Sequence, residues 1–213
     1  LIPMLQTNRG CPFLCTFCTE GQSFYNKVNK YGRERIFRDL DYIAERVNVP
    51  DLYIVDSNFG MFKEDLEVCR YISELQKKHG WPRYLHVSTG KNNKELVLEA
   101  ASLVDGAMSF SATIQTSDQQ ILKNIKRANI SLDQLIDAAK TAQGLGANSY
   151  SEVIMCLPGD TKEKHFQSIL SLVDSDINFV RMYQLMMLPG SEMSQKETRD
   201  KYGMKTSYRV MPR

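Results

Sequence analysis

The sequence predicts an α/β fold, a partial (β/α)6 TIM-like barrel with a parallel sheet. Short apolar segments alternate with amphipathic ones along most of the 213 residues, which is the pattern of successive β-then-α units. Six such units can be counted, whereas a complete barrel needs eight. Polar motifs follow directly after the apolar segments, at the strand ends where barrels of this type place their chemistry.

The first unit combines an apolar segment at residues 2–7 with a helix at residues 33–47. The apolar segment is strand-like and leads directly into a group of cysteines. The helix is predicted because Ile36, Leu40 and other apolar residues recur at helical spacing, while charged residues fill the opposite face. Pro50 then marks the end of this unit.

The second and third units follow the same plan. Residues 51–56 form a nearly continuous apolar run, as expected for a parallel strand buried on both faces, and residues 84–89 form the next strand. Helices are predicted over residues 63–79 and 94–103. Cys69 lies on the apolar stripe of the first of these helices, which predicts a small core residue.

The fourth unit begins with a strand at residues 107–112 and continues with two helices. Ser117 or Asp118 can cap a short helix that ends near Arg127, because either side chain can accept a hydrogen bond from the first helical turn. A longer helix is predicted over residues 132–145.

The last two units supply strands at residues 149–156 and 179–185, with a helix over residues 162–173 between them. We expect residues 1–190 to form the barrel domain and the polar residues 191–213 to form a C-terminal extension. Because the chain begins without an initiator methionine, directly in a predicted strand, we expect it to be a piece of a longer polypeptide.

Composition narrows the class of protein. A net charge of +2 with both signs interspersed gives no dedicated nucleic-acid surface and favours a small-molecule substrate. No run approaches the roughly 18 apolar residues of a membrane span. Five cysteines, three of them crowded together, do not make a disulfide framework and predict a reducing, cytoplasmic location.

The crowded cysteines are Cys11, Cys15 and Cys18. Three thiolates at this spacing can wrap one loop around one face of a [4Fe-4S] cluster and leave the fourth iron open, whereas a zinc site needs four ligands. A zinc site or unpaired thiols stay open as alternatives. The remaining cysteines and the histidines lie far away in the sequence and supply no local fourth ligand.

The spacing C-x-x-x-C-x-x-C resembles the signature of the radical S-adenosylmethionine (SAM) enzymes, and Phe17 is the aromatic residue that lies near the SAM adenine in that family. The resemblance implies a [4Fe-4S] cluster and SAM as cofactors and reductive cleavage of SAM to a 5'-deoxyadenosyl radical. It also implies an external one-electron reductant such as flavodoxin or ferredoxin.

Further motifs extend the resemblance after the fourth and fifth strands. Gln115 and Arg127 match the ends of a family motif in which the first residue contacts the ribose and the second pairs with the methionine carboxylate. Glu152 matches an acid directed toward the ribose. Cys156 and Asp160 depart from the family pattern Gly-Leu-Pro-Gly-Glu-Thr. Without the resemblance, Arg127 would be interpreted as an exposed cation at a helix end.

The segment after the second strand, with Asp56 and Asn58, is similar to the family segment that holds the methionine amino group. Helix capping by these residues is the alternative. Ser88 and Ser111 are expected to line the site. The segment 184–191 is similar to the cobalamin-dependent and methylthiotransferase-like branches.

The resemblance therefore predicts a radical SAM enzyme whose substrate is unspecified. Cobalamin bound by a domain outside this chain stays open, as does the reaction itself. Two alternatives are a non-catalytic iron–sulfur electron-transfer module and a tRNA-modifying methylthiotransferase-like enzyme. An electron carrier would hold its cluster with four protein ligands, and an RNA enzyme would need a basic patch.

Overall fold

The computed structural model describes residues 1–90, 93–111, 113–129, 131–144 and 147–208. The α-helices are α1 (Arg33–Ala44), α2 (Lys63–His79), α3 (Lys94–Leu103), α4 (Gln119–Asn124), α5 (Leu132–Gly144), α6 (Lys162–Val173) and α7 (Lys196–Lys201). The strands are β1 (Met4–Leu5), β2 (Asn8–Arg9), β3 (Asn29–Lys30), β4 (Asp51–Phe59), β5 (Tyr84–Thr89), β6 (Phe110–Ser111), β7 (Ser149–Met155) and β8 (Phe179–Gln184).

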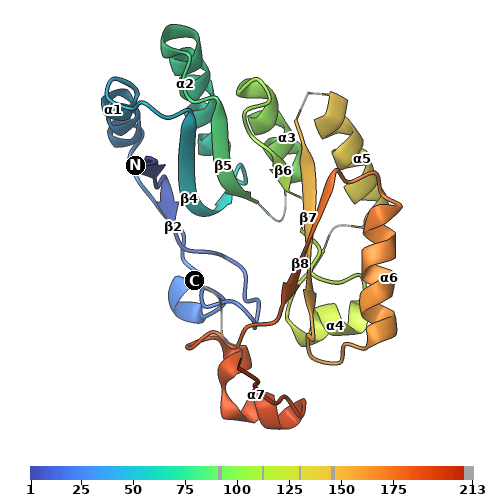
Figure 1. Ribbon diagram of the computed structural model, residues 1–213. Coiled ribbons are helices and arrows are strands. Elements are labelled where there is room, and N and C mark those ends of the chain that lie inside the picture. The colour runs from blue at the N-terminus through green and yellow to red at the C-terminus, as the bar shows by residue number, and fades with distance from the viewer. Residues whose placement is uncertain (91–92, 112, 130, 145–146, 209–213) are drawn as a thin grey trace.

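Six of these strands run parallel in chain order. One sheet has the order β1-β4-β5 and another the order β6-β7-β8. A parallel bridge between Leu85 and Met108 connects the two across β5 and the start of β6. Within the described residues β1 and β8 do not pair, so the barrel is open between them. The predicted partial barrel is confirmed (Figure 1).

The structure adds a small antiparallel ladder that the sequence did not predict. β2 pairs with β3, with Asn8 opposite Lys30 and Arg9 opposite Asn29. The segment predicted as one strand over residues 2–7 is correspondingly split, because the chain leaves the parallel sheet after Leu5 and turns into the ladder. This ladder closes the base of the loop that carries the cysteines.

Strand β4 is longer than predicted. It continues through Phe59, whereas the prediction ended it at Asp56 and placed a turn after it. Its side chains alternate, with Leu52, Ile54, Asp56 and Asn58 all buried. Polar residues on the buried face broke the apolar pattern, and a register shift between Ile54 and Phe59 makes this end of the strand irregular.

Other boundaries differ by a few residues, as is usual at frayed ends. Helix α1 ends at Ala44 instead of residue 47, and β6 contains only Phe110 and Ser111. Ala112 and Leu145, which the predicted strand and helix included, lie outside the described residues.

The main core lies between the helices and the outer face of the sheet. Its fully buried members include Leu40, Leu52, Ile72 and Phe110. Cys69 is also completely buried in this core, which confirms the prediction for that residue. Among the described helices, none is both long and apolar enough to cross a membrane.

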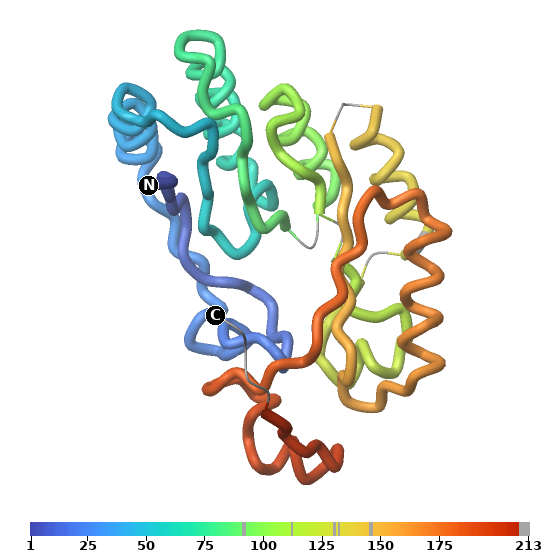
Figure 2. Tube along the Cα trace, viewed as in Figure 1, coloured from blue at the N-terminus to red at the C-terminus, as the bar shows by residue number. Residues whose placement is uncertain are grey.

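A second, smaller core connects the cysteine loop with the C-terminal segment. Its buried members are Ile121, Leu122, Ile125, Leu157 and Met193. The backbone N–H of Met193 donates to the Thr16 carbonyl at 2.8 Å, and the two segments lie side by side in Figure 2. The described part of the C-terminal extension therefore packs directly on the cysteine loop.

Candidate functional site

The loop that carries Cys11, Cys15 and Cys18 is tightly folded. Gly10 has a φ of +113°, and a Cβ there would lie 2.4 Å from the Lys27 carbonyl oxygen. At Gly21, a Cβ would lie 2.0 Å from the Cys15 carbonyl oxygen. Only glycine permits so close an approach of two backbone segments. The glycines therefore fix the path of the loop around its cysteines.

The cysteines of the loop form no disulfide and are largely shielded, since Cys11 and Cys15 are buried and Cys18 is half-buried. Within the described ranges, no three His, Cys, Asp or Glu side chains gather where they could hold a single metal ion. An iron–sulfur cube makes a different demand, because each thiolate binds a different corner and the three need not meet at one point.

Asp56 holds the entrance of this loop. Its two carboxylate oxygens accept hydrogen bonds from the backbone N–H and hydroxyl of Thr7 and from the backbone N–H and side-chain amide of Asn8. Burial raises the pKa of Asp56, and the hydrogen bonds from Thr7 and Asn8 act against this rise. The carboxylate is thus engaged in joining β4 to β2, and its expected role toward an amino group stays a prediction.

Asn58 lies two residues farther along the same face of β4 and reaches the cysteine loop itself. Its Nδ2 donates to Cys11 Sγ at 3.2 Å, and its exposed fraction is 2%. Its Oδ1 is buried and accepts no hydrogen bond. An acceptor left in this state normally has a partner, so the atom indicates a donor that belongs to a bound molecule.

A cavity of about 190 Å³ lies beside the loop, at the carboxyl ends of the strands. It gathers residues from four strands and the segments that follow them. Five of the predicted site residues line it, namely Ser88, Ser111, Gln115, Arg127 and Glu152. The lining also includes residues that sequence reasoning missed, namely Ser57, Thr89, Lys94, Thr113 and Tyr150.

Gln115 is held in a strained backbone conformation at this cavity. Its φ is +66°, in the left-handed region that non-glycine residues rarely adopt. Backbone hydrogen bonds to Glu152 (2.8 Å) and from Ile154 (2.9 Å) fix it beside β7. Its side-chain Oε1 is buried without a hydrogen-bond partner. Strain combined with an unused buried acceptor is typical of a binding position.

Arg127 connects the cavity to the cysteine loop. Its exposed fraction is 8%, which excludes an ordinary exposed helix-end cation. It donates to the Thr113 carbonyl at 2.5 Å and to Asn129 Oδ1 at 3.0 Å, and it also forms a hydrogen bond with Cys15. Burial lowers the pKa of Arg127, and the negative charges of Cys15 and Glu152 oppose this effect.

Lys94 is a second cation on the cavity wall. Its Nζ donates to the carbonyls of Gly90 and Ser111, both at 3.0 Å. Burial, with a smaller contribution from Arg127, lowers the pKa of Lys94 to about 8. No carboxylate in the described part of the chain forms an ion pair with it. A lysine in the first turn of a helix is usually exposed, so its sequence carried no signal of this role.

Glu152 faces inward from β7 and is the acid of the cavity. Its carboxylate lies 3.7 Å from an Arg181 guanidinium nitrogen, and that guanidinium lies 4.5 Å from the centre of the Tyr150 ring. A larger open hollow of about 520 Å³ shares Ser88, Tyr150 and Glu152 with the cavity and continues into the barrel interior. The cavity therefore opens onto a space that can admit a second molecule.

Phe17 lies outside the cavity lining, as do Asp56 and Asn58. Phe17 is half-buried and packs against the second core, close to the end of β7. Cys156 is exposed and has a φ of +69°, which explains why the family pattern carries glycine there. Cys156 thus lies far from the three cysteines of the loop in the sequence, and its side chain is exposed whereas theirs are buried or half-buried.

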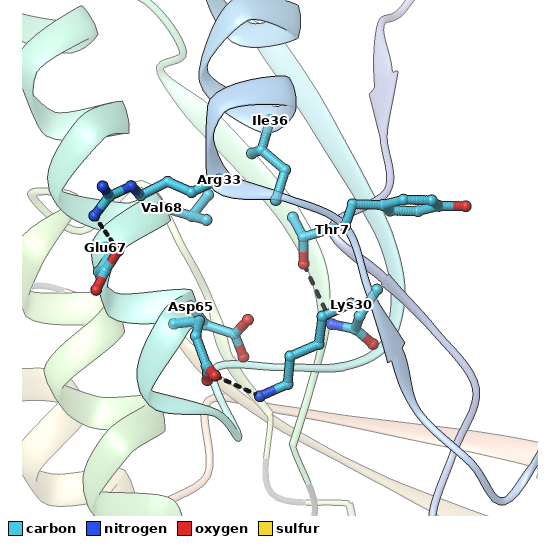
Figure 3. A pocket seen from close by; sticks show the side chains of 10 residues that line it. Thr7, Lys30, Arg33, Ile36, Asp65, Glu67 and Val68 are labelled. Carbon is cyan, nitrogen blue, oxygen red and sulfur yellow. Dashed lines mark hydrogen bonds and ion pairs between the residues drawn. The ribbon is translucent and has the colours of Figure 1, made fainter.

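A further pocket of about 80 Å³, on the side of α1 and α2, is shown in Figure 3. Its charges are paired among themselves, since Lys30 lies 2.7 Å from Glu64 and Arg33 lies 3.2 Å from Glu67. Asp65 there caps α2 by accepting from the Gly60 and Phe62 N–H groups. Because these charged side chains are engaged with one another or with backbone N–H groups, we interpret this pocket as a structural contact between α1 and α2 and not as a binding site.

Comparison with known proteins gives the family. The model of the Radical SAM superfamily matches residues 5–173, which is most of the chain. The chain belongs to the radical SAM superfamily. This confirms the predicted family, and with it the enzyme class and the [4Fe-4S] cluster and SAM that the superfamily uses.

Two curated relatives cover 94% of this chain. The cobalamin-dependent radical SAM methyltransferase TokK of Streptomyces tokunonensis is 31% identical over 205 residues. The 2-(S-pantetheinyl)-carbapenam-3-carboxylate methyltransferase of Streptantibioticus cattleyicolor is 28% identical over 205 residues. The chain spans only 30% of the length of each of these relatives.

Solved structures agree on the fold. The radical SAM methyltransferase TsrM from Kitasatospora setae, solved with cobalamin and a [4Fe-4S] cluster, has a TM-score of 0.78 at 14% identity. The match covers 97% of this chain and 38% of that one. Escherichia coli coproporphyrinogen III oxidase, a radical SAM enzyme, has a TM-score of 0.64 at 14% identity, covering 94% of this chain and 48% of that one.

The residues of the site fit the cofactor pair of the family. A methionine moiety carries an ammonium and a carboxylate. On the cavity wall the chain offers the buried Arg127, the half-buried Lys94 and the unused buried acceptor of Gln115. Asn58, which contacts the cysteine loop, supplies a second buried acceptor without a partner. The donor and acceptor set is thus complementary to SAM beside a cluster on the cysteine loop.

Proposed function

We propose that this chain is the catalytic core of a cobalamin-dependent radical SAM methyltransferase. Cys11, Cys15 and Cys18 would hold the [4Fe-4S] cluster and leave one iron open for SAM. The observation that carries this proposal is the connection made by Arg127, which lines the cavity and bonds to Cys15 at the same time. One residue thereby places a cofactor cavity next to the cysteine loop.

The polar residues of the cavity and of the neighbouring end of β4 would together contact the different parts of SAM. Arg127 and Lys94 would face the methionine carboxylate, for which the planar guanidinium offers two parallel donors. Asn58 Oδ1 would accept from the ammonium. Gln115 and Glu152 would contact the ribose. Asp56 would act through the loop that it holds.

Further polar and aromatic contacts would complete the SAM site. Ser88 and Ser111 would complete the polar wall of the cavity. Phe17 would lie near the adenine, at the end of β7 against which it packs.

When bound, the reduced cluster would supply the electron that cleaves SAM. The protein residues would orient the cofactor, since the buried polar side chains of Thr89, Ser111, Gln115 and Arg127 form part of the cavity wall. The adjoining hollow would admit a small-molecule substrate. An external one-electron reductant such as flavodoxin or ferredoxin, and a cytoplasmic location where thiols stay reduced, belong to the same proposal.

Methyl transfer and cobalamin rest on the relatives. TokK is described as cobalamin-dependent, and the TsrM structure contains cobalamin. We propose that cobalamin is bound by a domain outside this chain, because the relatives are about three times as long as the matched region. Methyl transfer can therefore be tested only in a protein that includes those flanking regions.

Anaerobic reconstitution tests the cluster directly. The chain should bind about four irons with matching sulfide. Alanine at Cys11, Cys15 or Cys18 should abolish the iron–sulfur absorption. Cys69→Ala is the matched control and should retain it, since that thiol is buried in the main core. Stable stoichiometric zinc without iron–sulfur absorption would overturn the proposal.

A further inference from the structure

The hydrogen bond between Asn58 and Cys11 places a neutral donor on one sulfur of the cysteine loop. Asn58 Nδ2 lies 3.2 Å from Cys11 Sγ, within the range for hydrogen bonds to sulfur, and both residues are buried at 2% and 4% exposure. A thiolate only accepts hydrogen bonds, so the NH2 group of the amide must face it. The orientation of the amide is therefore fixed by chemistry.

The fold ties together the two segments that make this contact. Asn58 lies at the irregular end of β4, directly before Phe59, which pairs with Thr89 of β5. Two residues before it, Asp56 binds Thr7 and Asn8, which lead into the loop of Cys11. The segments that carry the donor and the acceptor are therefore joined by hydrogen bonds close to the contact itself.

We propose that Asn58 raises the reduction potential of the [4Fe-4S] cluster by donating this hydrogen bond to the Cys11 thiolate. Reduction adds one electron to the cluster and increases the negative charge on its sulfurs. A donor at a sulfur stabilises the reduced state more than the oxidised state, and burial strengthens the interaction. The inference rests on the proposed function, because it needs a cluster on the three cysteines.

Asn58 is a better test of this effect than Arg127. Arg127 bonds to Cys15 but also lines the cavity, so its removal would change cofactor binding and cluster charge together. Asn58→Leu removes the N–H donor to Cys11 without adding a charge, so a change in its midpoint reports the hydrogen bond. Asn58→Asp keeps an oxygen acceptor where Oδ1 was, and because its carboxylate adds a negative charge beside the cluster, its midpoint should fall at least as far.

The experiment is a redox titration of the reconstituted chain, followed by the electron paramagnetic resonance signal of the reduced cluster. Asn58→Asp and Asn58→Leu should retain iron and become harder to reduce. At a fixed potential the ratio of reduced to oxidised cluster should fall about tenfold, a shift of about 59 mV for a one-electron couple. Asn178 is an exposed asparagine directly before β8, and Asn178→Asp should leave the midpoint unchanged.

Each outcome decides the inference. Loaded variants with the parent midpoint would overturn it and leave the cluster proposal intact. Loss of iron from both variants would also overturn it, because Asn58 would then retain the cluster without tuning it. Absence of iron–sulfur absorption in the unchanged chain would refute the proposed function instead.

Discussion

Replacing Lys94 by methionine should stabilise the chain while weakening its SAM site. The ammonium is buried on the cavity wall, and its pKa is lowered from 10.5 to about 8 by burial and by Arg127. Because a lower pKa means that the charged form is disfavoured, the ammonium costs about 3 kcal/mol in the folded state at pH 7. Loss of the hydrogen bonds to the Gly90 and Ser111 carbonyls reduces the expected net gain to about 1–2 kcal/mol.

The pH dependence follows from the direction of the shift. The pKa of Lys94 is lower in the folded state, so the penalty is fully present below about pH 8 and declines as pH rises toward 10.5. The free energy of unfolding of the unchanged chain should therefore rise with pH across this window. In Lys94→Met the rise should be smaller, because the titrating group is gone.

Urea denaturation of the cofactor-free chain at pH 7, 8.5 and 10 measures this difference. Lys140→Met, which removes an exposed lysine from α5, is the matched control and should change little. Calorimetry of the reconstituted protein should show SAM affinity reduced about tenfold in Lys94→Met, the effect of losing one hydrogen bond to a charged group. A variant that is less stable at pH 7 and binds SAM as tightly as its parent would refute the reasoning.

The remaining predictions concern three other residues. Arg127→Ala should weaken SAM binding by about 1.5–3 kcal/mol without removing iron, and Arg127→Lys should recover part of the loss; unchanged affinity by calorimetry would contradict the carboxylate assignment. Burial, with a smaller effect of Asp56, raises the pKa of Asp65 from 3.8 to about 6. Its protonated form therefore stabilises the folded chain below pH 3.8, and this stabilisation is lost as the pH rises to about 6. Asp65→Asn should therefore remove a decline of about 3 kcal/mol in the free energy of unfolding between pH 4 and 6; urea titrations with parallel pH profiles would contradict this. Cys156→Gly should raise the midpoint of thermal unfolding, since relief of a left-handed non-glycine residue is worth about 1 kcal/mol; a lower midpoint would show that the thiol contributes more than the strain.

Local patterns were sufficient for the architecture. Apolar residues at strand and helix spacing predicted the order of the six parallel strands, because burial on one face imposes a period that a single segment displays. The cysteine spacing likewise predicted the family, since three ligands of one cluster must lie on one short loop. The twelve-residue spacing between Gln115 and Arg127 suggested that both belong to one site, and both residues line the same cavity.

The surroundings of the polar residues on β4 were decided by the tertiary structure. Asp56 was expected at the end of the strand and Asn58 in the turn after it, both facing SAM, but the strand continues through Phe59 and directs both side chains to its buried face. Their partners Thr7, Asn8 and Cys11 lie 47 to 49 residues earlier in the chain. No local pattern can identify partners so distant, because strand register fixes which side chains meet.

The same reason explains Lys94 and Met193. A lysine at the start of a helix and a methionine in a polar tail look like surface residues, because sequence composition describes only near neighbours. Folding places the first beside Arg127 and packs the second beneath the cysteine loop. The sequence by itself thus determined the elements, their order and the family to which the cysteine loop points. The burial of each site residue depends on segments that are distant in the sequence. Because only the tertiary structure brings those segments together, it alone decided the charge state and the partners of the site residues.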